Sequence, residues 1–451
     1  MSRVACTGIA WAVLLFLGAG VASSQQSSVS ELLDAYIDQR FEADESATDE
    51  LLKKLDELGV KTLAEMETAL RAPRTCYPAT KELLGKYSAH DIDCYHVDYS
   101  SKFLLFVPEN LAGDKPLSIV VVGHGGNSSM SPERAESVAK MYLNAYAPAV
   151  SKEMNALVVA PCSGRGWGHI GNSLILSTIS KLQRMFPVDP DRIYITGQSM
   201  GGHLSFRSAL MLPDRFGAVS PQSGGYDFVE NGSIGNLLSV PGYAIWGSSE
   251  PYGINTDNRT NAEWGKQHGL DWKFVEKNGG HTIYQDELPA MAGFFNDHPR
   301  NLYRDSVYIS QGGEMKFVKT WEIKGWPEHT VYFEKRPLRW NLRQWVEIAP
   351  RTDSTDLQTL LAKNTGDNRI EITSNNVRNV KLLLHPNLVD FSQPVVVKVN
   401  GKVFFEKMVE PNPNLMLELA REFDDRGRIF HACIDLNIDT DQEVVIPVEN
   451  Q

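Results

Sequence analysis

Hydrophobic positions in the middle of the chain form short continuous runs, and between these runs they follow helical spacing. Continuous runs such as 119–122 and 157–159 are typical of parallel strands covered on both faces. Strands are expected at Lys102–Val107, Leu117–Val122, Ala156–Ala160, Arg192–Thr196, Ala218–Pro221, Tyr243–Trp246 and Trp272–Val275. Helices are expected at Pro132–Leu143, Leu174–Met185, His203–Leu212 and Asp286–Phe295. This alternation over residues 90–299 predicts a doubly wound, mostly parallel α/β sheet.

The segment before this region has a helical pattern. Leucines recur at helical spacing within residues 25–75. Ser28 with Glu31, and Thr62 with Glu65, fit the capping-box pattern, in which two polar side chains satisfy the first backbone N–H groups of a helix. We therefore expect a helical N-terminal segment.

After residue 299 the pattern changes to short strand-like runs. Asn400-Gly401 lies between two of them and is a two-residue hairpin signal. Residues 300–451 are therefore predicted to form a mostly antiparallel, β-rich accessory domain. Tryptophans in this region either line a carbohydrate-binding face or pack in the core: Trp321, Trp326, Trp340 and Trp345.

The first 24 residues have the pattern of a signal peptide. Arg3 supplies the positive charge, Ile9–Leu17 the apolar run, and residues 21–24 the small side chains of a cleavage site. The apolar run is shorter than the roughly 20 residues that a spanning helix needs. We expect an exported protein, secreted or periplasmic, with no membrane span.

Composition excludes some classes of function. The formal net charge is −12, with 42% hydrophobic and 22% charged residues. Because no basic stripe is present, nucleic-acid binding is not expected. The scattered cysteines lack C-x-x-C spacing, so no metal site is expected. Export permits disulfides, and a Cys76–Cys94 pair is the local choice among the four later cysteines: Cys76, Cys94, Cys162 and Cys433.

The most specific motif is Gly197-Gln198-Ser199-Met200-Gly201, a G-x-S-x-G pattern. It follows a β-branched run and precedes a helical run, which is the context of a nucleophile elbow. The two glycines leave room for a tight strand-to-helix turn with Ser199 exposed at its tip. We expect Ser199 to act as a nucleophile.

A serine nucleophile needs a base and an orienting acid, which follow it in the order acid, then histidine, in α/β-hydrolases. His281 fits the base because it follows a predicted strand and two glycines. Glu250 lies four residues beyond the strand at 243–246 and is the preferred acid. Asp257, farther along what is expected to be the same loop, is the alternative.

Backbone N–H groups are needed to stabilise the oxyanion that forms during the reaction. Met200, directly after the serine, is expected to supply one of them. The loop His124-Gly125-Gly126, directly after a predicted strand, is expected to supply the other from Gly125 or Gly126. His124 is expected to brace this loop.

These motifs resemble a known group. The run Phe186–Gly202, His124-Gly-Gly and Gly280-His281-Thr282 are similar to secreted α/β-hydrolases. The group includes feruloyl-esterase-like and poly(3-hydroxybutyrate) depolymerase-like enzymes, carboxylesterases and the prolyl oligopeptidase catalytic domain. The resemblance covers about residues 100–298. It implies the roles given above for Ser199, His281, Met200 and the glycine loop.

In that group an aspartate is usual where this chain has Glu250. The resemblance also implies that the loop carrying Trp167 borders the active site. Three residues are therefore candidates for the substrate pocket: Gln198, His124 and Trp167.

Together these features predict an exported serine hydrolase that cleaves carboxylic esters through an acyl-enzyme and needs no cofactor or metal. Its substrate would be a small-molecule or polymer-borne ester, with an additional polysaccharide contact through the C-terminal domain. Two alternatives stay open: a serine peptidase of the prolyl oligopeptidase type, and a non-catalytic binding protein on a hydrolase scaffold.

Overall fold

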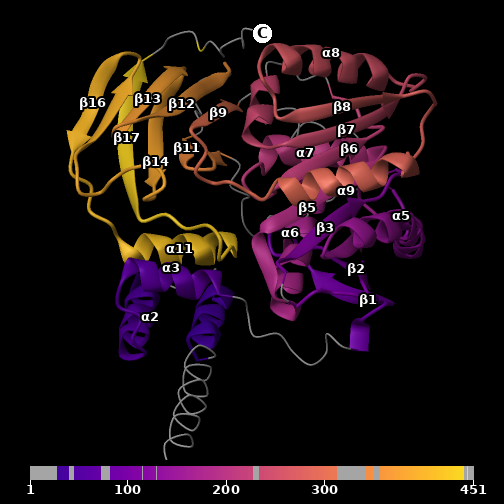
Figure 1. The fold of residues 1–451 in the computed structure, drawn as a ribbon, viewed down its shortest axis with the longest axis horizontal. Helices are drawn as coiled ribbons and strands as arrows, with labels where there is room; N and C mark the ends of the chain where they lie inside the picture. The colour runs from indigo at the N-terminus through magenta and orange to yellow at the C-terminus, as the bar shows by residue number, and fades with distance from the viewer. Residues whose placement is uncertain are drawn as a thin grey trace, which may run out of the picture. The chain divides into compact units, whose positions relative to one another are not determined.

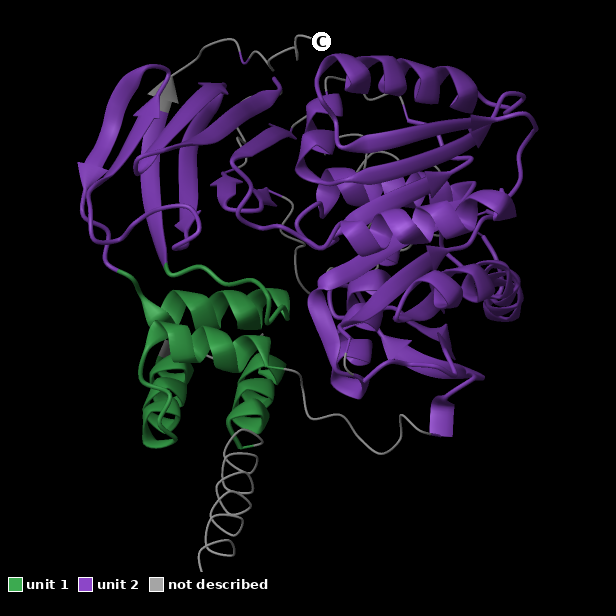
Figure 2. Ribbon diagram, viewed as in Figure 1, with its two compact units in different colours: residues 1–76, 411–431 green, residues 77–410, 432–451 purple. Residues whose placement is uncertain are grey.

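The computed structural model describes residues 28–39, 45–72, 82–113, 115–127, 129–226, 233–311, 341–349, 356–440 and 444. The chain divides into two compact units (Figure 2): residues 1–76 with 411–431, and residues 77–410 with 432–451. These limits differ from the regions expected from the sequence, and the boundary near residue 300 stays a prediction. The predicted signal peptide, residues 1–24, lies outside the described residues.

The larger unit contains an eight-stranded sheet (Figure 1) in the order β1-β2-β4-β3-β5-β6-β7-β8. Strand β2 is antiparallel to both of its neighbours, and every pair from β4 to β8 is parallel. The predicted mostly parallel α/β sheet is thus confirmed. The strands are β1 (Lys86–Asp93), β2 (Ser100–Val107), β3 (Leu117–Gly123), β4 (Ala156–Pro161), β5 (Val188–Gln198), β6 (Ala218–Gln222), β7 (Gly242–Gly247) and β8 (Trp272–Lys277).

Helices lie at all four places where the sequence predicts them. Those found where the sequence predicts them are α5 (Pro132–Glu153), α6 (His169–Met185), α7 (Met200–Met211) and α9 (Leu288–Asp297). The remaining ones are α8 (Ile254–Gln267) and the short 3₁₀ helices η1 (Ile234–Ser239) and η2 (Gln285–Glu287). Within the described part of the chain, no helix combines the length and the apolarity that a bilayer span requires.

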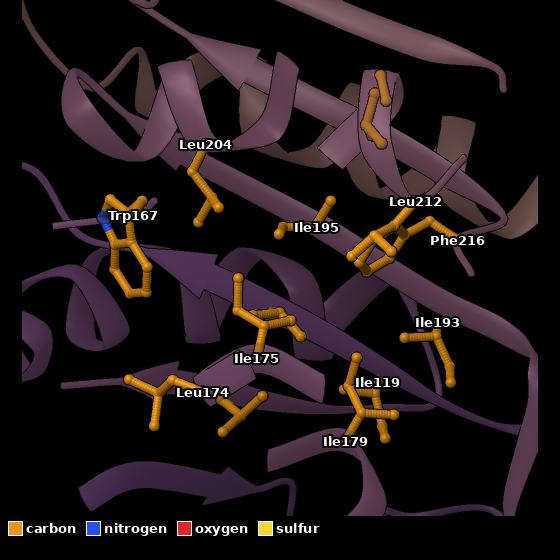
Figure 3. Close-up of a cluster of buried hydrophobic side chains, with 14 of the residues drawn as sticks. Ile119, Trp167, Leu174, Ile175, Ile179, Ile193, Ile195, Leu204, Leu212 and Phe216 are labelled. Carbon is orange, nitrogen blue, oxygen red and sulfur yellow. The ribbon is translucent and has the colours of Figure 1, made fainter. Parts of the chain in front are cut away.

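Alternate side chains of the central strands pack on opposite faces of the sheet, as strand geometry requires. Ile119 and Val121 belong to a buried cluster with side chains of α6 and α7. Val120 and Val122 belong to a second cluster with side chains of α5 and α9. Because both faces are covered, the runs 119–122 and 157–159 are hydrophobic at every position. Figure 3 shows part of the first cluster, including Ile119, Ile193, Ile195, Leu174, Ile175 and Ile179.

Helix α8 corrects the expectation of a loop around Asp257. Two of its buried residues are polar, Asn258 and Asn261. Their side-chain amides donate to the backbone carbonyls of Gly224 at 2.7 Å and Tyr226 at 2.8 Å. The helix therefore packs against the chain after β6 partly through hydrogen bonds, and it lacks the apolar stripe by which helices are recognised in a sequence.

Among its described residues, the rest of the larger unit contains two small sheets. Their orders are β16-β15-β13-β12-β9 and β10-β11-β14-β17, and all their pairs are antiparallel except β13 with β15. The predicted mostly antiparallel region is thus confirmed. The strands are β9 (Ser306–Gln311), β10 (Leu342–Arg343), β11 (Val346–Ile348), β12 (Gln358–Gly366), β13 (Arg369–Asn375), β14 (Val377–Leu384), β15 (Val395–Val399), β16 (Lys402–Lys407) and β17 (Ala432–Thr440).

Two details of this β region bear on the sequence predictions. Asn400 and Gly401 connect β15 to β16 with φ values of 47° and 80°, as a two-residue hairpin requires. Trp345 is fully buried, and its indole N–H donates to the carbonyl of Arg304 at 2.8 Å. It is thus a core residue and does not line a carbohydrate-binding face. The other three tryptophans named for such a face lie outside the described residues: Trp321, Trp326 and Trp340.

The smaller unit is helical. It comprises a helix at residues 28–38, α2 (Glu45–Glu57), α3 (Leu63–Arg71) and α11 (Pro413–Phe423). One hydrophobic cluster joins N-terminal side chains such as Leu33 and Leu55 to Met416 of α11. The capping box of Thr62 and Glu65 is present, with hydrogen bonds of 2.9 and 3.2 Å. Cys76 lies outside the described residues, so its pairing with Cys94 stays a prediction.

Candidate active site

Ser199 lies at the junction between strand β5 and helix α7. Its backbone has φ 61° and ψ −120°, a conformation that costs a residue other than glycine on the order of 1–3 kcal/mol. Two hydrogen bonds hold it in place: the Ser199 N–H donates to Gln222 O at 2.9 Å, and Ser199 O accepts from the His203 N–H at 3.0 Å. The strained turn directs the serine side chain away from both the strand and the helix.

Two glycines permit this turn because the backbone of β3 passes very close to it. A Cβ atom added to Gly197 would lie 2.2 Å from Gly123 O, and one added to Gly201 would lie 1.9 Å from the same oxygen. Both distances are far below a van der Waals contact. The glycines of the G-x-S-x-G motif are therefore required by close packing between β3 and the elbow.

His281 connects Ser199 to Glu250. Its Nε2 lies 2.8 Å from Ser199 Oγ, and its Nδ1 lies 2.6 Å from Glu250 Oε2. The His281 side chain is 32% exposed, whereas the Glu250 side chain is fully buried. The second oxygen of Glu250 accepts from the Gly247 N–H at 3.2 Å, so both carboxylate oxygens have donors.

These contacts determine the tautomer of the histidine. An ionised carboxylate only accepts hydrogen bonds, so the Nδ1 that faces Glu250 carries the proton. Nε2 is then an acceptor for the hydroxyl of Ser199. Among the described residues, no cluster of three or more possible metal ligands includes His281 or Glu250. Nε2 of His281 is thus placed to accept the proton of Ser199.

The loops that carry the acid and the histidine follow adjacent parallel strands, β7 and β8. Two backbone hydrogen bonds tie them together: Ser248 N–H donates to Lys277 O at 2.7 Å, and Ser249 N–H to Gly279 O at 2.8 Å. The Tyr284 hydroxyl donates to Gly280 O at 2.6 Å. The relative position of Glu250 and His281 is thus set by the sheet itself.

The alternative acid, Asp257, lies elsewhere. It is in the first turn of α8, and its carboxylate faces the backbone of Gly225, where an added Cβ would lie 2.9 Å from Oδ2. Glu250 is the residue that the structure brings to Nδ1 of His281. Sequence order alone left these two carboxylates unresolved.

The loop after β3 also contacts the elbow. The Tyr142 hydroxyl donates to Oε1 of Gln198 at 2.6 Å, and a Cβ atom added to Gly125 would lie 3.2 Å from Gln198 O. Gly126, one of the two glycines expected to supply an oxyanion donor, has φ 120°. Met200, the other expected donor, is the first residue of α7.

His124 holds this loop in place through hydrogen bonds of both ring nitrogens. Its Nδ1 donates to Gly125 O at 2.9 Å, and its Nε2 accepts from the Ser163 N–H at 3.0 Å. Burial lowers the pKa of His124 to about 4, so the ring stays neutral and keeps this tautomer. Because the peptide between Gly125 and Gly126 is planar and trans, fixing Gly125 O also fixes the direction of the Gly126 N–H.

The three residues predicted to border the substrate are all buried. The exposed fractions are 0% for His124, 2% for Trp167 and 6% for Gln198. The Trp167 indole N–H donates to His124 O at 2.8 Å. These side chains therefore support the loop, and their contact with a substrate stays a prediction. Tyr142 completes this support, and no local motif marks it in the sequence.

His203 lies one turn after the serine, on helix α7. Its Nδ1 donates to Gly225 O at 2.7 Å, which ties α7 to the chain after β6. Its pKa is lowered mainly by burial and also by the nearby Arg207 and His281. A neutral His203 keeps an additional positive charge away from His281.

This fold and site define a serine hydrolase of the α/β-hydrolase class, and comparison with known proteins narrows the class. The Esterase family, described as "Putative esterase", matches residues 174–325. Probable feruloyl esterase C of Aspergillus oryzae is 30% identical over 236 residues, which cover 49% of this chain and 83% of that protein. The protein of the same name from Aspergillus flavus matches with the same identity and coverage.

A crystal structure of a thermostable esterase is 19% identical, with a TM-score of 0.42, over 49% of this chain and 64% of that one. The chain belongs to the Esterase family and is a serine carboxylic ester hydrolase.

Proposed function

We propose that Ser199, His281 and Glu250 are the catalytic triad of this esterase. The observation that carries the proposal is the continuous pair of contacts from Ser199 Oγ to His281 Nε2 at 2.8 Å and from His281 Nδ1 to Glu250 at 2.6 Å. The strained backbone of Ser199 supports it, because such strain gathers at functional sites.

In the proposed reaction, Nε2 of His281 takes the proton of Ser199 as Oγ attacks the ester carbonyl. The resulting imidazolium is stabilised by the carboxylate of Glu250. His281 then gives the proton to the leaving alcohol as the ester bond breaks, which leaves an acyl group on Ser199. A water molecule repeats the two steps, giving its proton to His281 and its oxygen to the acyl group, so that the acid is released.

The oxyanion of each tetrahedral intermediate would accept hydrogen bonds from the N–H groups of Met200 and Gly126. The hydrogen bond from His124 to Gly125 O supports a donor that is oriented before the substrate binds. Preorganised donors of this kind are usually the largest single contribution to catalysis in acyl transfer.

The proposed substrates are esters of aromatic hydroxycinnamic acids, carried by a small alcohol or by a polymer. The support is the similarity to the two Aspergillus proteins, each of which is named probable feruloyl esterase C. Export to the periplasm or the medium is part of the proposal and depends on the signal-peptide pattern of residues 1–24. N-terminal sequencing of the exported protein tests that part by locating the cleavage site.

The activity is tested by assaying the purified protein on nitrophenyl esters of increasing acyl length, on methyl ferulate and on dipeptidyl amides. Ser199→Ala is the matched control. We expect ester turnover that falls to background in the variant, with the largest kcat/KM on the feruloyl ester. Turnover of the amides alone would favour a peptidase, and no turnover by the wild-type protein would favour a non-catalytic binding protein.

A further inference from the structure

The outer edge of the five-stranded sheet carries a cluster of exposed hydrophobic side chains. Strand β16 ends the order β16-β15-β13-β12-β9 (Figure 1), and its inner edge is paired with β15. Six large hydrophobic side chains are exposed among the described residues, and half of them lie on β16 or directly after it: Val403 at 53%, Phe404 at 37% and Met408 at 48%. Single exposed hydrophobic residues are normal, whereas a cluster marks an interaction site.

The free edge of β16 is able to pair with another strand. An edge strand presents backbone N–H and C=O groups that a second strand can bind, and lysines and bulges protect most edges from indiscriminate pairing. Strand β16 has Lys402 and Lys407. Its pairing with β15 also shifts register, which leaves Phe404 as an additional residue. These features oppose most registers of pairing but not one in which they match.

One antiparallel register between two copies of β16 is complementary at every position. When Phe404 faces Phe404 of a second copy, Lys402 faces Glu406 and Val403 faces Phe405. Two-fold symmetry makes each of these two contacts occur twice. The additional residue of each strand then faces that of the other strand, so regular pairing can continue on both sides of it.

The neighbouring registers lack this complementarity. A shift of one residue in one direction places Lys402 opposite Lys407 and Val403 opposite Glu406, and a shift in the other direction places Lys402 opposite Phe405. Opposite charges that face each other across two strands stabilise the pair, and like charges destabilise it. Within the described part of the chain, neither Lys402 nor Glu406 forms an ion pair, so both charges are available to a partner.

We propose that β16 joins two copies of this chain, paired antiparallel about Phe404. The strand combines an exposed apolar surface with charges that are complementary to themselves under a two-fold axis, as an isologous interface requires. A contact between two six-residue strands is small beside the roughly 1,200 Å² of the smallest standard interfaces. The dimer is therefore expected to be weak, with a Kd in the micromolar range.

The first test uses sedimentation velocity of the full chain at about 1 to 200 µM, the range in which a micromolar Kd is measurable. Lys402→Glu makes both charged positions negative, and Glu406→Lys makes both positive. Their partners within the fold are Val399 and Val396, so neither change places like charges together inside one chain. Each variant alone should raise the Kd about tenfold or more. An equal mixture of the two variants should associate as tightly as the wild type, because each glutamate then faces a lysine.

The second test concerns the apolar contact. Phe404→Glu should be monomeric over the same concentrations, whereas Met141→Glu, at a 58% exposed position of α5, should associate as the wild type does. The Tm of each variant shows whether it is folded, and the mixture of charge variants remains decisive if Phe404→Glu is not.

A wild-type chain that stays monomeric at the highest concentration would overturn the proposal and leave this edge to a different partner. A mixture that associates no better than its components, or equal association of Phe404→Glu and Met141→Glu, would overturn it as well. The proposal does not depend on ester hydrolysis, and none of these outcomes bears on the proposed function.

Discussion

The two loops that flank Ser199 are built in opposite ways. On the β3 side, the loop at 123–127 rests on His124, Trp167 and Gln198, which are at most 6% exposed. On the β7 side, the loop at 247–253 buries Glu250 but displays Tyr252, which is 94% exposed. One loop has a supporting layer of side chains beneath it, and the other leaves an aromatic ring in solvent.

The difference matches two different tasks. Oxyanion donors must be fixed before the substrate arrives, because reorganisation during the reaction would raise the barrier. Buried hydrogen-bonded supports supply that rigidity. The loop after β7 has a different task, because it must hold the carboxylate of Glu250 against His281. Substitutions in the two loops should therefore have different effects.

Glu250→Gln, which changes the buried residue of the β7 loop, is expected to have the largest effect on kcat. The amide cannot stabilise the imidazolium, and its N–H₂ group favours the wrong histidine tautomer, so kcat should fall by about 10³–10⁴-fold, as for the equivalent change in other triads. Asp257→Asn is the matched control and should change kcat less than about threefold. Comparable losses in the two variants would contradict the assignment of Glu250.

A smaller loss is expected for Gly201→Ala on the β3 side. The new Cβ would lie 1.9 Å from Gly123 O, so the elbow must shift by more than about 1 Å, a displacement that can cost about 10²-fold in rate. Gly293→Ala is the control, because an added Cβ there meets no atom within 4 Å. Full kcat in Gly201→Ala, measured on a nitrophenyl ester, would show that the elbow is not tightly packed.

The support under the β3 loop should also make stability depend on pH. The pKa of His124 is about 4 in the folded protein and 6.5 ordinarily. The unfolded chain therefore takes up a proton between pH 6.5 and pH 4 that the folded chain does not, and stability falls as the pH falls through this window. Above pH 6.5 the contribution is constant.

His124→Gln removes this titration. Between pH 7 and pH 4.5, the free energy of unfolding should fall by about 2 kcal/mol more for the wild type than for the variant. Denaturant unfolding at the two pH values measures this difference. The variant should also lose about tenfold in kcat at pH 7, since Gly125 O is held less well. Equal pH dependence of the two proteins would place His124 outside the buried network.

Much of the sheet and the centre of the site were predictable because their signals are local. The apolar strand before Ser199, the helix after it and the flanking glycines lie within about 20 residues of one another. The Asn400-Gly401 hairpin is local as well, since both residues accept a positive φ. Patterns of this kind are visible wherever one short segment determines its own geometry.

The features that the sequence did not predict depend on contacts between distant parts of the chain or on the packing of polar side chains. Helix α8 buries Asn258 and Asn261, so its buried face lacks an apolar stripe. Strand β1 is a largely exposed edge strand, and its sequence is polar. The support beneath the glycine loop joins Tyr142 to Gln198 and His124 to Ser163, pairs that are far apart in the chain. No short pattern encodes such pairs.

The most direct test of the account is covalent labelling of the nucleophile. A fluorophosphonate reacts when a serine oxygen bonds to its phosphorus and fluoride leaves, with the serine proton taken by the histidine. We predict one adduct per chain by intact mass, carried by the peptide that contains Ser199, and none in Ser199→Ala. No adduct on the folded wild-type protein, or an adduct on another residue, would contradict the account.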